Sequence, residues 1–295
     1  MKTYLECIPC FFKQALFAAR AATKDESKSK QVLDRIAGFV PDIPLDNPPP
    51  ETARMVYSAV REITGVYDPL RVQKEESIEN ALSFYEGLKA TVDCSRDPLR
   101  AAVRVAIAGN VMDFGANPDF NLKDELADLL EKKLCIDHYE SFKHSLEKAR
   151  TILYIGDNAG ETVFDRILIE AMGKDTVYAV RNIPVINDAT IEDAEKSGIN
   201  NVARIISSGC NAPGTILKTC SEEFLDTYHS ADVIVSKGQG NLEGLSEEKG
   251  PIFFLLMVKC PVIARHLDAK TGEMILLDGR LQDNSFLECS ERRAI

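Results

Sequence analysis

Oxygen-bearing side chains follow two apolar, β-like runs in this sequence, where they could bind a divalent cation. Asp157 and Asn158 come directly after TILYIG, and Asp188 lies in the loop RNIPVINDAT that follows the next such run. Two carboxylates and an amide oxygen are hard ligands, which suit Mg²⁺ or Mn²⁺. Zn²⁺ more often recruits His or Cys, and the four histidines lie outside these loops. The alternative for each loop is a turn followed by a helix cap, because Asp and Asn are favoured at both.

Two lysines stand where they could meet an anionic group near such a cation. Lys237 follows DVIVS and precedes two glycines and Asn241 in SKGQGNLEGL, and glycines let backbone amides approach an anion. Lys259 interrupts the apolar run IFFLLMVKCPVIA. An unpaired buried ammonium would cost several kcal/mol there, so we expect it to reach a polar site. A plain turn at Lys237 and a snorkelling surface lysine at Lys259 are the alternatives.

The chain from residue 150 to residue 280 alternates between strands and helices. Its short β-branched runs, most of them followed by a helical pattern, are TILYIGD, TVYAVRN, NVARIISSG and DVIVSKG. They predict an α/β domain with an open, mostly parallel, Rossmann-like sheet flanked by helices. The site is then expected in the loops after the strands. Because adjacent strands lie ~5 Å apart, Asp157, Asn158 and Asp188 could converge on one metal ion.

Three further segments of this part have simpler expected roles. The run PIFFLLMVKCPVIA predicts another buried strand or strand pair, and GEMILLDGR could add an edge strand. The loop SSGCNAPGT supplies small residues, so we expect it to form a wall of the site.

Residues 1–149 are predicted to form an all-helical amino-terminal domain, because apolar residues recur there at three- and four-residue spacing. The proline-rich segment 41–50 is expected to connect two helices. In GNVMDFGANPD, a Gly-Asn break after a helical run marks a helix end, from which Asn110 and Asp113 would project over the site. Ordinary C-capping is the alternative. Residues 281–295 show no clear period and are expected to form a frayed tail.

Composition and charge exclude several functional classes. The chain has 295 residues, and its net charge of -11 and pI near 5.0 disfavour extended binding to nucleic acid. No run approaches the roughly 20 apolar residues that a membrane span needs, and the amino terminus MKTYLECIPC lacks a signal-peptide pattern. We therefore expect a cytoplasmic protein without a membrane partner. The eight cysteines are scattered over a long chain, which suits reduced thiols or a metal site better than a disulfide framework.

Cys7 and Cys10 have the CxxC spacing of metal and redox sites. A full structural zinc site needs four ligands, and the sequence holds no second CxxC, so Cys94 or Cys135 would have to complete it. A thioredoxin-like role is disfavoured because no strand precedes the pair. The alternative is that CIPCFF opens a helix with small buried thiols. The pair is a candidate second metal site or redox site.

The motifs GDNAGE, RNIPVINDAT and SKGQGNLEGL occur in this order behind a helical part that contains GNVMDFG. With this set the chain resembles the damage-control phosphatases, once catalogued as domain of unknown function 89. The resemblance spans nearly the whole chain. Its CIPC motif makes the chain similar to the prokaryotic and archaeal branch of this family. It implies a helical amino-terminal part, an α/β domain, and divalent-metal-dependent hydrolysis of phosphate monoesters of small metabolites. Such a housekeeping or metabolite-repair hydrolase would use Mg, Mn, Co or Ni and a small phosphorylated metabolite.

The resemblance also implies roles for individual residues. They are the metal ligands and catalytic residues Asp157, Asn158 and Asp188, the catalytic Glu161, and the substrate-binding Lys237, Asn241, Lys259, Asn110 and Asp113. In this hypothesis the metal lowers the pKa of a water and the lysines stabilise the phosphate oxygens. Glu161 would orient water or protonate the leaving group. Direct attack by Asp157, which gives an aspartyl-phosphate, is the alternative.

Two other functional classes compete with a phosphatase. A sugar or nucleotide transferase on a Rossmann-like sheet fits less well, because no GxGxxG opens the first βα turn and no P-loop GxxxxGK[ST] occurs. The other alternative is a non-catalytic module that binds a metal or a phosphometabolite and signals this binding through the CxxC pair. No motif specifies an oligomeric state.

Overall fold

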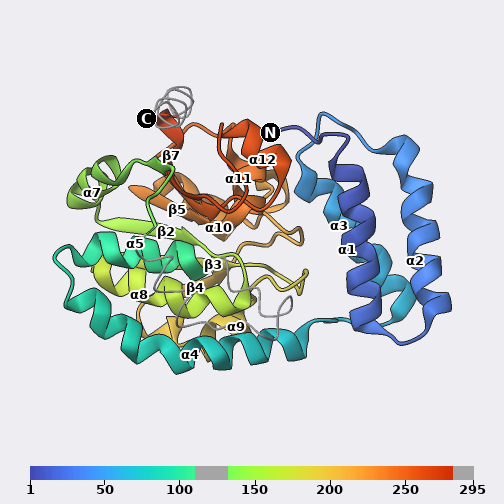
Figure 1. Cartoon of the computed structure of the whole chain (residues 1–295), viewed down its shortest axis with the longest axis horizontal. Helices are drawn as coiled ribbons and strands as arrows, with labels where there is room; N and C mark the ends of the chain where they lie inside the picture. The colour runs from blue at the N-terminus through green and yellow to red at the C-terminus, as the bar shows by residue number, and fades with distance from the viewer. Residues whose placement is uncertain (110–131, 282–295) are drawn as a thin grey trace.

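The computed structural model describes residues 1–109 and 132–281, in which one seven-stranded sheet has helices on both faces (Figure 1). The strands are β1 (Ile136–Asp137), β2 (Thr151–Ile155), β3 (Asp175–Val180), β4 (Arg204–Ser207), β5 (Val233–Lys237), β6 (Ile252–Met257) and β7 (Met274–Asp278). Their spatial order is β1-β7-β6-β5-β2-β3-β4, and every neighbouring pair is parallel except β6 with β7. The prediction of an open, mostly parallel sheet is confirmed.

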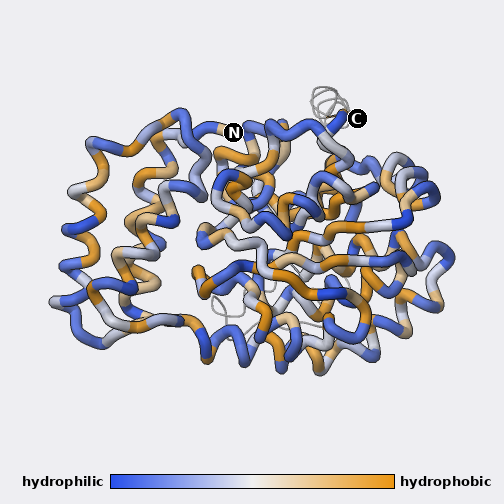
Figure 2. Tube along the Cα trace, turned by 180° about the vertical axis from the view of Figure 1, so that it is seen from behind, coloured by the Kyte–Doolittle hydropathy of each residue, from blue (hydrophilic) through white to orange (hydrophobic). Residues whose placement is uncertain are grey.

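Both faces of the sheet are buried because successive side chains of a strand point to opposite sides. In β2, Ile152 and Tyr154 join one apolar cluster, while Leu153 and Ile155 join another. The first cluster is covered by α4 (Arg71–Asp93), α5 (Pro98–Ala108), α7 (Tyr139–Lys148), α8 (Thr162–Met172) and α9 (Ile191–Lys196). The second is covered by α10 (Glu222–Ser230), α11 (Gly238–Leu245) and α12 (Pro261–His266). Strands buried on both sides need apolar residues throughout, and Figure 2 shows mainly hydrophobic colours along them.

The first helices of the chain form a separate group beside the sheet (Figure 1). They are α1 (Cys7–Ala22), α2 (Glu26–Phe39) and α3 (Pro49–Thr64). The carboxylate of Asp25 caps α2 by accepting from the amide of Ser27, and Gly65, with a φ of 75°, ends α3. Their apolar faces bury one another and also pack against Val185 in the loop after β3. The predicted helical amino-terminal region is therefore present, and it touches the edge of the sheet where the site is expected.

The packing differs from the expected division at residue 149. Helices α4 and α5 share an apolar cluster with the sheet, and β1 pairs with β7, although both segments precede residue 149. An amphipathic helix buries its apolar face on any complementary surface, so helical periodicity alone does not separate the two parts. Lys74 of α4 makes buried ion pairs with Asp193 of α9 at 2.8 Å and with Asp68 at 2.9 Å, which fixes α4 on the sheet domain.

Two segments near the end of the described chain were expected to form strands. The run from residue 251 forms the single buried strand β6, as one of the two alternatives had it, and Pro261 then opens α12. Strand β7 is not at the edge, since β1 lies outside it. The expected tail lies outside the described residues after residue 281. Among the described helices, none combines the length and apolar character that a bilayer crossing requires.

The strand order changes direction between β2 and β5. From β2 the chain proceeds through β3 and β4 toward one edge, whereas β5, β6 and β7 follow toward the other. In open α/β sheets, ligands bind at the carboxyl ends of the strands at such a switch point. The loops that follow β2 and β5 therefore define the candidate site.

Candidate functional site

Backbone hydrogen bonds join the loops after β2 and β3. The amide of Ala159 donates to the carbonyl of Asn187 at 2.8 Å, and the amide of Ala189 donates to the carbonyl of Asp157 at 2.7 Å. These bonds flank an isolated antiparallel bridge between Asn158 and Asp188. The two loops on which the proposed metal ligands lie are thus brought together by main-chain pairing.

One guanidinium group faces both carboxylates of the candidate metal site. Arg181, which follows β3 and is fully buried, donates from Nε to Asp188 Oδ2 at 2.7 Å. Its Nη2 lies 4.0 Å from Asp157 Oδ1 and donates to Asn241 Oδ1 at 3.0 Å. Asp157 and Asp188 therefore approach the same guanidinium group, and their convergence on one metal ion stays a prediction.

Asn158 connects Asp157 with Glu161. The side-chain amide of Asn158 donates to Asp157 Oδ2 at 3.3 Å and to Glu161 Oε1. These bonds use the nitrogen of the Asn158 side chain, so its oxygen is the atom that could bind a cation. Glu161 is 2% exposed and stands at the start of α8.

Lys237 belongs to a buried ionic network under the site. Its ammonium donates to Asp165 Oδ1 at 2.5 Å and to Glu161 Oε2 at 3.2 Å. Asp165 also accepts hydrogen bonds from the hydroxyls of Tyr154 and Tyr178, both at 2.7 Å. Burial lowers the pKa of Lys237, but the two carboxylates outweigh this and raise it, so the ammonium stays charged. The group that was predicted to face a substrate phosphate is held by two carboxylates in this structure.

Asn241 ties α11 to the ends of β2 and β5. Its side-chain nitrogen donates to the carbonyls of Lys237 at 2.7 Å and Gly156 at 3.1 Å. Its oxygen accepts from Arg181 and, at 2.9 Å, from the hydroxyl of Thr215. The side chain is fully buried and fully hydrogen-bonded, so in this structure it positions the loops and does not present a surface to a substrate.

The charges of the site are out of balance. Among the described residues, the buried carboxylates of the site are Asp157, Glu161, Asp165 and Asp188, and its buried cations are Arg181 and Lys237. Burial, followed by repulsion from Glu161 and Asp188, raises the pKa of Asp157 well above its usual value. Buried carboxylates that repel one another are stabilised by a bound cation. The residues therefore fit a divalent cation held by Asp157, Asp188 and the Asn158 oxygen.

The proposed metal ligands are not all ionisable side chains, because one of them is the amide oxygen of Asn158. Within residues 1–109 and 132–281, no three His, Cys, Asp or Glu side chains are arranged to hold a metal without help from another residue type. The candidate site pairs two carboxylates with an amide oxygen. Such a set leaves several positions for water, which is typical of Mg²⁺ sites.

Glycine is required where α11 begins. Gly238 has a φ of 78°, and a Cβ built on it would lie 1.9 Å from Asp157 Oδ2. The carboxylate therefore sits directly against the amino terminus of α11, where the helix dipole favours negative charge. A residue with a side chain at this position would displace Asp157. This close approach explains the glycine after Lys237 better than the requirements of an ordinary turn do.

Lys259 lies at the rim of the site. The strand β6 ends at Met257, so this lysine lies beyond the apolar run, and its side chain is exposed. Its backbone amide donates to Gln239 Oε1 at 3.2 Å, and its positive charge lowers the pKa of Asp157. Among the predicted substrate-binding lysines, it is the one with solvent access.

Because of Glu243, on α11, we expect the stability of the protein to depend on pH. Burial raises the pKa of its carboxyl group from 4.5 to about 7, although Gln239 donates a hydrogen bond to it. The folded state then binds more protons than the unfolded state between these values, so stability falls as pH rises from about 4.5 to 7. Glu243→Gln should remove this slope and stabilise the protein above pH 7 by on the order of 2 kcal/mol.

Urea unfolding at several pH values measures this effect. The control is Glu248→Gln, because Glu248 is exposed just after the same helix. A slope that is identical in the wild type and in the Glu243 variant would contradict the assignment.

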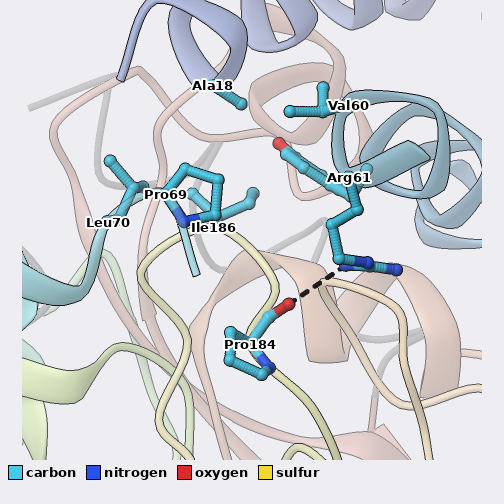
Figure 3. A pocket seen from close by; sticks show the side chains of 8 residues that line it. Ala18, Val60, Arg61, Pro69, Leu70, Pro184 and Ile186 are labelled. Carbon is cyan, nitrogen blue, oxygen red and sulfur yellow. Dashed lines mark hydrogen bonds between the residues drawn. The ribbon is translucent and has the colours of Figure 1, made fainter. Parts of the chain in front are cut away.

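The helical amino-terminal group contacts the loop that holds Asp188. Burial and the charge of Asp188 raise the pKa of Tyr57, on α3, well above its usual value, so this phenol is neutral and lies toward the site. Arg61 donates to the carbonyl of Pro184 at 3.2 Å (Figure 3). Ile186, two residues before Asp188, has a φ of 47°, which is strained for a β-branched residue and typical of functional loops.

A small cavity lies between α1, α3 and this loop (Figure 3). Its lining residues are Ala18, Tyr57, Val60, Arg61, Pro69, Leu70, Pro184 and Ile186. Its volume is about 10 Å³, which is room for about one water molecule. The cavity is therefore a packing gap between the helical group and the site loop and not a substrate pocket.

The remaining predicted residues have separate outcomes. Asn110 and Asp113 lie outside the described residues. Cys7 and Cys10 are thiols in the first turns of α1, but Cys7 is half-buried and Cys10 is exposed, so they are not the buried thiols of the helix-opening alternative. Cys94 directly follows the last residue of α4.

Sequence reasoning missed residues that hold the proposed ligands. Arg181 directly follows the buried run of β3, and the argument applied to Lys259, that a charge beside an apolar run must find a partner, would have identified it. Asp165 carries the same signal within the apolar helix TVFDRILIEAM. Thr215 offered no comparable signal, because it is an ordinary loop residue whose contacts are all distant in sequence.

Comparison with known proteins is consistent with this arrangement. The family described as "Damage-control phosphatase ARMT1-like domain" matches residues 3–275. The chain belongs to this family. A damage-control phosphatase of Pyrococcus horikoshii is 34% identical over 290 residues, which cover 96% of this chain and all of that protein. A damage-control phosphatase of Archaeoglobus fulgidus is 32% identical, over 93% of this chain and 98% of that one.

Two further proteins that are similar to this chain extend the comparison. An uncharacterised protein of Methanocaldococcus jannaschii is 34% identical, over 92% of this chain and 94% of its own. The crystal structure of a protein of the domain-of-unknown-function-89 family from P. horikoshii has a TM-score of 0.88 and 33% identity, covering 95% of this chain and 99% of that chain. The similarity therefore includes both the helical group and the sheet.

Proposed function

We propose that this protein is a divalent-metal-dependent phosphatase that hydrolyses phosphate monoesters of small metabolites. The observation that carries the proposal is that, within residues 1–109 and 132–281, buried carboxylates outnumber buried cations at the β2/β5 switch point. The curated relatives named damage-control phosphatase support the reaction class. The metal would be Mg, Mn, Co or Ni, and the substrate a small phosphorylated metabolite such as a sugar phosphate.

The proposed ligands are Asp157, Asn158 and Asp188. When bound, the cation would withdraw charge from a phosphate oxygen and lower the pKa of a water molecule. Arg181 holds Asp188 in place through the 2.7 Å bond to its carboxylate. Catalytic groups held in this way need no reorganisation during the reaction.

Glu161 is the proposed acid–base residue. Asn158 donates a hydrogen bond to one oxygen of its carboxylate and Lys237 donates to the other, so its orientation is fixed. From there it could orient water or protonate the leaving group. Lys237 then acts through Glu161 as a positioning residue and does not have to touch the phosphate.

Lys259 is the proposed cation for the substrate phosphate, because it is exposed and its charge reaches Asp157. We expect Lys259→Met to raise KM for a sugar phosphate by about tenfold, as the loss of one charge-assisted contact predicts. Thermal stability should not change, because the side chain is exposed. Steady-state kinetics with the control Lys249→Met measure this effect. An unchanged KM would remove Lys259 from the substrate site.

Metal removal tests the proposal most directly. After dialysis against EDTA, hydrolysis of p-nitrophenyl phosphate should fall to background and return with Mg²⁺, Mn²⁺, Co²⁺ or Ni²⁺. The activating ion should also stabilise the fold, by about 2.7 kcal/mol at a hundredfold excess over its Kd. A panel of sugar phosphates then identifies the preferred ester class. Hydrolysis that survives complete metal removal, or that no metal restores, would argue against this function.

A further inference from the structure

Two cysteines lie in one cluster behind the wall of the site. Cys210, in the loop after β4, is fully buried, and Cys220, just before α10, is partly exposed. Cys220 packs against the buried apolar cluster that contains Cys210. The Cys210 thiol donates to the carbonyl of Gly214 at 3.3 Å, and the Cys220 thiol donates to the carbonyl of Ile216 at 3.5 Å. The two side chains therefore belong to one cluster although the residues are ten positions apart.

The backbone around the pair forms a closed loop. The amide of Ser221 donates to the carbonyl of Ser208 at 2.9 Å. A Cβ built on Gly209, which has a φ of 75°, would lie 3.2 Å from the carbonyl carbon of Cys220. The chain on either side of the loop is thus held side by side, and a disulfide requires close Cα atoms of this kind.

We propose that Cys210 and Cys220 are a redox modification site, at which a reversible disulfide closes the loop of residues 210–220. This loop belongs to the site, because Thr215 within it donates to Asn241 Oδ1 at 2.9 Å and accepts from Arg181 at 3.3 Å. Gly214 adds a second contact, since a Cβ built on it would lie 2.4 Å from the carbonyl oxygen of Gly240. The disulfide would restrain the segment that positions Arg181 and Asn241.

The co-reactant is a hydroperoxide. Cys220, the partly exposed member, loses its proton to solvent, and its thiolate attacks one peroxide oxygen. The O–O bond breaks, and the leaving hydroxide takes up a proton to become water. The Cys210 sulfur then attacks the resulting sulfenic acid of Cys220, the S–O bond breaks, and the Cys210 proton leaves in a second water. Two thiols are oxidised to one disulfide and one peroxide is reduced to two waters.

A metal is a poorer occupant of this pair. Structural zinc needs four ligands, and the described residues offer no set of three His, Cys, Asp or Glu side chains arranged for a metal. Two thiols in one packed cluster are sufficient for a disulfide once their sulfur atoms meet. The geometry therefore favours thiol oxidation.

Peptide mapping tests the proposal, because Lys218 lies between the two cysteines. The native protein is treated with hydrogen peroxide, the remaining thiols are blocked with N-ethylmaleimide, and the chain is digested with trypsin. Peptides 205–218 and 219–237 each contain one cysteine of the pair. We expect them to be joined, lighter by two hydrogen atoms than the reduced pair, and separated by dithiothreitol. Amide exchange in peptide 205–218 should slow when the link is present.

Matched variants separate a specific link from general oxidation. Cys220→Ser should abolish the joined peptides, and Cys94→Ser, at an exposed cysteine elsewhere, should leave them unchanged. Melting temperatures of both variants establish that they are folded. The proposal is overturned if both peptides of the folded wild type carry maleimide after peroxide treatment, or if they are joined only after unfolding in urea. None of these readouts depends on phosphatase activity.

Discussion

Asp157→Asn is expected to lower kcat/KM for metal-dependent phosphate hydrolysis by about a thousandfold or more, which is the scale for removing a principal electrostatic group from an active site. The substitution keeps the size of the side chain but removes one of the two anionic ligands beside Arg181. Metal affinity should fall with it, so titration with Mn²⁺ followed by calorimetry provides a second measurement. The control is Asp175→Asn, because Asp175 is exposed at the opposite end of a neighbouring strand.

The same variant should not be less stable than the wild type in the absence of metal. Repulsion from Glu161 and Asp188, together with burial, disfavours the ionised carboxylate of Asp157. Asparagine carries no charge, so the metal-free variant should unfold at an equal or higher temperature. Loss of activity with retained stability would be the signature of a ligand. A variant that keeps full activity, or one that loses activity only because it unfolds, would contradict the assignment.

The sheet could be predicted because its signals are local. β-branched runs that end in turn residues identified β2 to β5, and parallel topology then required their following loops to share one edge. That is why Asp157, Asn158 and Asp188 could be grouped before any coordinates. What the sequence could not specify is the pairing that joins their loops, since the bridge from Asn158 to Asp188 depends on the main chain.

The partners of the lysines could not be predicted, because they come from elements distant in sequence. Lys237 pairs with Asp165, which is 72 positions away, and a sequence pattern does not say which buried charge meets which. For Lys259 the local signal was sufficient. The cost of an unpaired ammonium in an apolar run predicted that it reaches a polar environment, and the strand ends before it and leaves it exposed. The sequence could not specify that Lys237, which was expected to meet an anion in the same way, is held by buried carboxylates.

The position of α4 and α5 illustrates a further limit. Their helical periodicity was sufficient to predict helices, but an apolar stripe does not identify the surface that covers it. The buried ion pair between Lys74 and Asp193 links positions 119 apart. Such contacts decide which helices pack on the sheet. A boundary at residue 149 that is drawn from periodicity therefore does not reveal that α4 and α5 share an apolar cluster with the sheet.

Lys237→Met is expected to lower the free energy of unfolding by about 3–5 kcal/mol, the usual cost of removing one partner of a buried ion pair. The loss arises because Asp165 and Glu161, which are 0% and 2% exposed, would lose their shared cation. Urea unfolding at neutral pH measures the effect. The exposed Lys249→Met is the control and should shift the midpoint little.

A double variant tests whether the uncompensated charge is the cause. In Asp165→Asn/Lys237→Met, the amide can still accept a hydrogen bond from Tyr154 or Tyr178, while one buried negative charge has been removed together with the positive one. Much of the lost stability should therefore return, with a coupling energy of 0.5–3 kcal/mol between the two sites, roughly the range for residues in contact. If instead the double variant is less stable than Lys237→Met by the full effect of Asp165→Asn alone, the two residues are independent. Lys237 would then be released from the network and available to the phosphate, as its sequence motif first suggested.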